Sequence, residues 1–165
     1  MVLQGVIAVH IAAGLTAVIS GAVAMFAPKR RGRHPRAGHV YLLAQVSVAA
    51  TAVLIVTARP HTAYLLILGS VAVATASCGY AARRIRWRGW LRYHISGMGL
   101  SYIALLTAFY VDNGPRLPVW SLLPPITFWF LPSAVGLPLL IRALLRNWIG
   151  VGHRKPAAIQ QGKGL

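Results

Sequence analysis

Residues 2–36 read VLQGVIAVHIAAGLTAVISGAVAMFAPKRRGRHPR, a long run without a charged side chain followed by a cluster of Lys and Arg. The uncharged part exceeds the ~20 residues that a helix needs to cross the hydrocarbon core of a bilayer. It lacks the basic leading segment and the short apolar run of a cleavable signal peptide, so we expect it to stay in the mature protein. The stretch therefore predicts a transmembrane helix over residues 2–27.

The same alternation of apolar run and basic cluster repeats along the chain. Of the 165 residues, 57% are hydrophobic, and 17 Lys and Arg stand against a single acidic residue, Asp112. A soluble domain of this length needs a polar surface, whereas long apolar runs fit stacked spanning helices. We predict one all-α, multispanning membrane helix bundle, with five transmembrane helices over residues 2–27, 40–58, 62–82, 93–111 and 117–141.

Turn signals separate the later spans. Arg59-Pro60 closes the second span, and its short link to the third predicts a tight antiparallel hairpin. Residues 112–115, DNGP, end the fourth span. The fifth span is expected to be kinked or to start late, because each proline removes a backbone donor and crowds the preceding turn. Its prolines are Pro118, Pro124, Pro125, Pro132 and Pro138.

The positive charge gathers in the links after the first and third spans and in the segment after the fifth. Only Arg59 and Arg116 fall in the other links. Lys and Arg collect on the cytoplasmic side of short loops, so we expect a protein of the bacterial cytoplasmic membrane with its N-terminus outside and its C-terminus in the cytoplasm. Residues 1–149 then form the bundle, and residues 150–165 form a disordered basic tail.

The net charge of +16 raises nucleic acid as a partner. Because apolar runs separate the basic clusters, anionic lipid head groups are the nearer phosphates, and we expect the lipid bilayer and no nucleic acid as the partner. A homo-oligomer stays open. The only cysteine, Cys78, lies in an apolar stretch and is expected to be a small buried core residue.

Ionisable groups at membrane depth are the candidates for chemistry, since burying them is costly. His10 shares one helix face with Gly14 and Gly21, which is bare enough for a neighbouring helix or a flat macrocycle. His39 and His94 begin the second and fourth spans at the same boundary. Two histidines on facing helices can bind a b-type haem through both axial positions. His10, His39 and His94 are therefore candidate ligands of haem iron, in a protein that passes electrons to or from quinone.

A second polar layer is expected at the outer boundary, where His10, His61 and Asp112 share a depth. Asp112 also lies on the same helix face as His94, five turns further on. In a proton-coupled transporter, Asp112 and His10 would exchange a proton at the outer mouth, and Asp112 and His61 would form a proton or polar site. His10, His61 and Asp112 together could form a metal site. A non-catalytic membrane subunit that binds anionic lipid is the third class. One carboxylate excludes a carboxylate dyad within one chain.

Several short motifs resemble one bacterial family. They are residues 10–14 (HIAAG) with Ser20-Gly21, residues 38–41, Gly79-Tyr80 with Arg83, residues 94–104 (HISGMGLSYIA) and residues 107–114 (TAFYVDNG). The pattern resembles the uncharacterised small integral membrane proteins grouped as domain of unknown function 2306, over residues 9–142. The resemblance implies a multispanning bacterial membrane protein without an assigned activity. That family has an adjacent His-Arg pair in the first basic loop, where Pro35 here separates His34 from Arg36, so either His34 or His39 occupies the family position.

Overall fold

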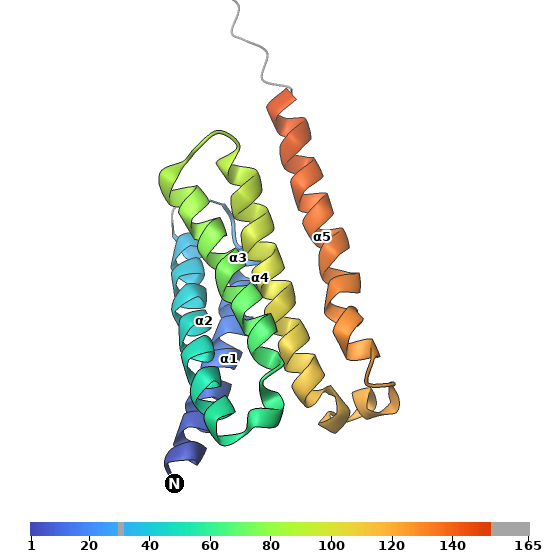
Figure 1. Cartoon of the computed structure of the whole chain (residues 1–165). Coiled ribbons are helices and arrows are strands. Elements are labelled where there is room, and N and C mark those ends of the chain that lie inside the picture. Colours follow the sequence, from blue (N-terminus) through green and yellow to red (C-terminus); the bar gives the residue numbers. More distant parts are fainter. Residues whose placement is uncertain (30–31, 153–165) are drawn as a thin grey trace, which may run out of the picture.

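The computed structural model describes residues 1–29 and 32–152, which contain helices and no strand (Figure 1). The α-helices are α1 (Val2–Phe26), α2 (Arg33–Ala58), α3 (Leu65–Ile85), α4 (Trp90–Asn113) and α5 (Thr127–Gly152). All five are long and apolar enough to cross a membrane. The prediction of an all-α bundle with five spanning helices is confirmed, and the chain has the architecture of a multi-pass membrane protein.

The helices pack as two hairpins with a fifth helix beside them. α1 lies against α2 and α3 against α4 along most of their lengths, whereas α2 and α3 contact each other more sparsely. α5 packs against α4 (Figure 1). Because successive helices run in opposite directions, the α1–α2 link, the α3–α4 link and the C-terminal end of α5 lie at one end of the bundle, shown at the top of Figure 1.

Glycines bring α3 and α4 into backbone contact. A Cβ added to Gly97 would lie 2.5 Å from the carbonyl oxygen of Thr75 and 2.7 Å from the amide nitrogen of Gly79. A larger side chain at Gly97 would therefore push the two helices apart. Small residues at helix contacts are the usual means of close packing in a bilayer, because lipid tails are as apolar as the side chains and supply no hydrophobic drive.

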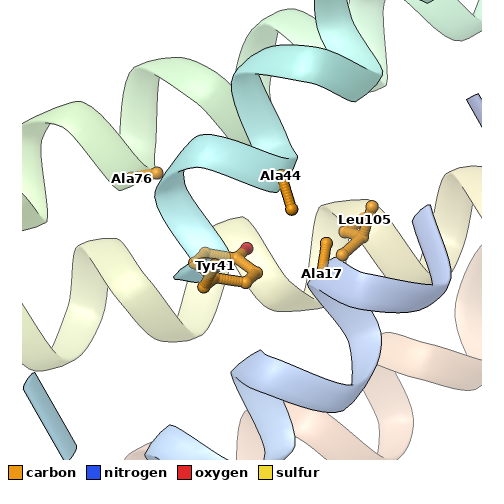
Figure 2. Close-up of a cluster of buried hydrophobic side chains, with 5 residues drawn as sticks. All are labelled: Ala17, Tyr41, Ala44, Ala76 and Leu105. Carbon is orange, nitrogen blue, oxygen red and sulfur yellow. The ribbon is translucent and has the colours of Figure 1, made fainter. Parts of the chain in front are cut away.

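The centre of the bundle is a core of small residues around one tyrosine. Figure 2 shows its side chains, which come from α1, α2, α3 and α4: Ala17, Tyr41, Ala44, Ala76 and Leu105. Tyr41 is only 1% exposed, and its hydroxyl shares a 2.7 Å hydrogen bond with the hydroxyl of Ser101. Tyr102 donates its hydroxyl proton to the Val18 carbonyl at 3.0 Å. These bonds satisfy polar groups where lipid offers no partner, and they tie α1 and α2 to α4.

The bounds of α2 and α3 differ from those of the predicted spans. α2 begins at Arg33 rather than at residue 40, because the helical backbone continues from the apolar region into the basic link. α3 begins at Leu65, after a 3-10 turn over Pro60–Thr62, and ends at Ile85 rather than at residue 82. Charged residues thus occupy helix ends that project beyond the apolar run, where a count of uncharged residues does not detect them.

The prolines of the fifth span act as expected. The 3-10 turns η2 (Gly114–Arg116) and η3 (Val119–Leu122) precede α5, which begins at Thr127 rather than at residue 117. Pro132 and Pro138 lie inside α5. The helix continues to Gly152, so it includes the first residues of the expected tail, and residues 153–165 lie outside the described part of the chain.

Cys78 is exposed, so its prediction as a buried core residue is wrong. The buried face of α3 carries Ala72, Ala76 and Gly79. Cys78 is two residues, about 200° of helix rotation, from Ala76 and so lies on the opposite side of the helix.

Candidate functional site

The structure brings two histidines together at the end of the bundle that carries the basic links. His34 lies in the first turn of α2, and His94 lies in the second turn of α4. Both side chains are half-buried. Their ring centroids are 6.2 Å apart, with the ring planes at 85°. Of the two histidines that sequence left open, His34 is the one that meets His94.

Each of the two imidazoles is oriented by a backbone carbonyl of a neighbouring helix. The Nδ1 of His34 lies 2.8 Å from the Ala24 carbonyl oxygen, near the end of α1. The Nδ1 of His94 lies 2.9 Å from the Gly79 carbonyl oxygen in α3. A carbonyl only accepts, so both Nδ1 atoms carry the proton and donate it. Each Nε2 is therefore an unprotonated acceptor, open to a metal ion or a hydrogen-bond donor, and an anionic oxygen would bond to it only through an added proton. The pair joins four helices.

Cationic side chains surround the two rings. Lys29 donates from Nζ to the carbonyl oxygens of Ala24 at 3.0 Å and Met25 at 2.6 Å, at the end of α1. Partial desolvation in this position lowers the pKa of Lys29. Lys29 and Arg83 both act electrostatically on the His34 and His94 rings.

An aromatic ring connects a further cation to this cluster. The guanidinium carbon of Arg86 lies 6.0 Å from the centroid of the Trp90 ring, which is itself 6.4 Å from the His94 ring. The only acidic residue of the chain, Asp112, lies near the opposite end of α4. The cluster, called here the His34–His94 site, therefore contains no acidic side chain. It consists of Lys29, His34, Arg83, Arg86, Trp90 and His94.

His39 does not join His94, contrary to the expected pairing. Its side chain is exposed, and its Nδ1 donates to the Pro35 carbonyl of its own helix at 2.8 Å. The ring lies 6.2 Å from that of Tyr80 on α3. Because α2 begins seven residues earlier than expected, His34 rather than His39 lies at the end of the bundle that carries the basic links.

His10 lies toward the other end and has a different partner. Its Nδ1 is 2.8 Å from the hydroxyl of Thr51 on α2. Thr51 gives its own proton to a carbonyl of its helix, Ser47 O at 2.7 Å, so His10 donates this hydrogen bond. Asp112 acts electrostatically on His10, which supports the expected shared depth of these two residues.

The expected outer metal site is not assembled. His61 is exposed in the turn at Pro60–Thr62. Among the residues that the structure describes, no three His, Cys, Asp or Glu side chains converge as metal ligands would. His10, His61 and Asp112 therefore form no such group, and neither do His10, His39 and His94.

The glycine face of α1 is only partly open. A Cβ at Gly21 would lie 2.5 Å from the Tyr102 ring, so this ring already fills the position expected to admit a macrocycle. At Gly14 nothing lies within 4 Å. Gly21 is therefore a packing position, where α1 lies against the Tyr102 ring of α4.

Gln45, which is 2% exposed, was not among the site residues predicted from sequence. Within the described residues its Oε1 is a buried side-chain atom without a hydrogen-bond partner. Gln45 lines a groove of about 320 Å³ between α2 and α3. A signal was present, because Gln45 is the only amide side chain in residues 40–58 and polar groups at membrane depth are costly.

Comparison of the chain with family models, with curated proteins and with solved structures finds no match. The function is therefore inferred from the geometry and charge of the sites.

Proposed function

We propose that the chain is a multi-pass protein of the bacterial cytoplasmic membrane that binds the phosphate of an anionic lipid head group at the His34–His94 site. One observation carries the proposal: the site gathers Lys29, Arg83 and Arg86 around two imidazoles, and the chain's only acidic side chain lies elsewhere. Basic pockets between transmembrane helices at the cytoplasmic side are typical binding sites for anionic head groups.

The distribution of charge supports the orientation with the N-terminus outside. Among Lys and Arg of residues 1–29 and 32–152, those of the α1–α2 link, the α3–α4 link and α5 lie at one end of the bundle, and only Arg59 and Arg116 lie at the other. The positive-inside rule puts the basic end in the cytoplasm. The His34–His94 site then faces the leaflet whose head groups carry negative charge. The same proposal includes membership of the family that the sequence motifs resemble.

The chemistry of the site suits a phosphate group. Guanidinium groups are permanently charged and bind phosphate oxygens in pairs. Trp90 adds an amphipathic ring at the boundary between lipid and water, where such rings are enriched. Binding of a phosphate would also offset the mutual repulsion of Lys29 and Arg83.

Lipid retention measured by native mass spectrometry tests the proposal. The protein is extracted from nanodiscs that contain equal amounts of phosphatidylglycerol and phosphatidylcholine. Arg83→Gln should lower retained phosphatidylglycerol about tenfold, since a hydrogen bond to a charged group contributes about 1.5–3 kcal/mol. Arg59→Gln removes the same charge at the opposite end and serves as the matched control. Equal retention of the two lipids by the unmodified protein would contradict the proposal.

A second candidate, a haem-binding electron-transfer protein acting with quinone, is favoured by one distance. Two imidazoles on one metal ion have ring centroids about 6 Å apart, given metal–nitrogen distances of about 2.0–2.1 Å. The centroids of His34 and His94 are 6.2 Å apart, and both Nδ1 atoms are fixed by carbonyls, as is usual for metal-bound histidine. Haem supplies one-electron chemistry when bound; Arg83 and Lys29 could pair with its propionates.

An absorption spectrum separates the two candidates. After expression with ample haem, the second candidate predicts a Soret band that is lost in His34→Ala and His94→Ala and kept in His39→Ala. A purified protein without this band would remove the haem candidate and leave the lipid proposal untouched.

A further inference from the structure

The seam between α2 and α3 contains a groove. Its volume is about 320 Å³, and most of its lining is apolar, including Leu42, Val46 and Val73. This volume falls in the range of small-molecule sites, about 300–1,000 Å³.

One polar group on the wall of the groove lacks a partner. Gln45 is 2% exposed, and its Oε1 accepts no hydrogen bond from the described residues. Leaving such a group unpaired in an apolar medium costs on the order of 1–3 kcal/mol. In a bilayer the missing donor has to come from protein or from a lipid-soluble molecule, because the hydrocarbon region holds no water to supply it. Gln45 Oε1 therefore lacks a hydrogen-bond donor, which a ligand with a hydroxyl group would supply.

A second polar position lies at the rim of the groove, one and a half turns along α2. His39 precedes Gln45 by six residues, which is about 9 Å along the helix axis. Its Nδ1 donates to the Pro35 carbonyl, so its Nε2 is left for a ligand. The Tyr80 ring, 6.2 Å from the His39 ring, also lines the groove.

We infer that the α2–α3 groove binds the ring of a lipid-soluble quinol, with one hydroxyl donating to Gln45 Oε1 and the other to His39 Nε2. Both of these atoms are acceptors, so they suit the two hydroxyl donors of a quinol and not the carbonyl oxygens of a quinone. Only binding is inferred, and it does not depend on the lipid proposal for the His34–His94 site.

Equilibrium binding of decylubiquinol, kept reduced with dithionite, to the full-length protein in detergent, followed by the ligand-induced rise in melting temperature, tests this inference. Decylbenzene, which has a similar apolar body and no oxygen, is the comparison ligand. The inference predicts a saturable rise with decylubiquinol and at least a tenfold weaker effect with decylbenzene. Equal effects of the two ligands would show a merely apolar groove and overturn it.

Gln45→Leu gives the sharpest variant, because a purely structural role and a ligand-binding role predict different results. Without ligand this variant should melt at a higher temperature than the unmodified protein, since it removes an unpaired buried group. It should nevertheless bind decylubiquinol at least tenfold more weakly. Undiminished binding by Gln45→Leu would overturn the inference.

Two histidine variants provide a matched pair. His39→Ala should weaken decylubiquinol binding severalfold, whereas His61→Ala, in an exposed turn at the other end, should leave it unchanged. If Gln45→Leu instead converts a dimer into a monomer on size-exclusion chromatography with light scattering, the groove accommodates a second copy of this chain, and the quinol inference is overturned.

Discussion

The two ends of the bundle both carry half-buried histidines, but in opposite electrostatic surroundings. At the inner end, His34 and His94 lie among Lys29, Arg83 and Arg86, without an acidic side chain. At the outer end, His10 has a hydroxyl partner and lies within the electrostatic range of Asp112. The Nδ1 proton is satisfied at both ends, so the difference lies in the counter-charge. The proposed lipid phosphate would supply the counter-charge that the inner end lacks.

The largest expected effect comes from breaking the contact that positions the inner end. Gly97→Val would force a side chain against the backbone of Thr75 and Gly79 and separate α3 from α4. We expect a loss of about 3 kcal/mol of stability or of the folded protein altogether, at the high end of overpacking costs. Thermal unfolding in detergent measures this loss. Gly69→Ala, which meets nothing within 4 Å, is the control and should melt no lower than the unmodified protein.

An acidic side chain introduced at the inner end should prevent the binding of an external anion. Arg83→Glu places a carboxylate beside His34 and His94, where it would repel phosphate. Retained phosphatidylglycerol in native mass spectra should fall more than tenfold, that is by more than about 1.4 kcal/mol of binding free energy. Arg59→Glu makes the same change at the outer end and should have little effect. Similar losses in both variants would mean that net charge, rather than the site, holds the lipid.

The two ends can be compared directly through their histidines. His94→Ala removes a ligand-facing Nε2 and the bond to Gly79, whereas His10→Ala removes only the bond to Thr51. Each should lower stability by about 1 kcal/mol, the usual net value of one hydrogen bond. Only His94→Ala should weaken lipid retention, by severalfold. The comparison fails if His10→Ala releases as much lipid as His94→Ala.

The smallest effect is expected from the chain's only acid. Asp112 is half-buried and contacts Asn113 at 3.5 Å, a long and weak hydrogen bond. Asp112→Asn should change stability by less than about 0.5 kcal/mol and leave lipid retention unchanged, because isolated partly exposed charges contribute little. Proton flux into liposomes that depends on Asp112 would instead assign the outer end a transport role.

The five spans could be predicted from sequence because each apolar run exceeds the thickness of the hydrocarbon core and basic clusters separate several of them. The helix ends could not, since α2 continues through Arg33 and Arg36 into the basic link. Because of this error, His39 was expected to pair with His94, whereas His34 does so in the structure. A span prediction follows hydropathy, whereas the partner of a histidine depends on where its helix actually starts.

The groove at Gln45 could not be predicted from sequence for a different reason. A single amide in an apolar run can be detected by eye, but its lack of a partner depends on the spacing of α2 and α3, which no local pattern encodes. Gly97 and Gly79 close the α3–α4 seam through backbone contact. Side chains such as Tyr80 and His39 line the α2–α3 seam instead. Small residues in the sequence indicated close packing without indicating which pair of helices would share it.

The most direct test measures dipolar coupling between lipid phosphorus and histidine nitrogen by solid-state NMR. The protein is labelled with ¹⁵N-histidine and placed in phosphatidylglycerol bilayers, and the signals are assigned with His10→Ala, His34→Ala and His94→Ala. Our account predicts that phosphorus dephases the Nε2 signals of His34 and His94 and leaves that of His10 unaffected. Dephasing of none of them, or of His10 as strongly as His94, would contradict a phosphate site at the inner end.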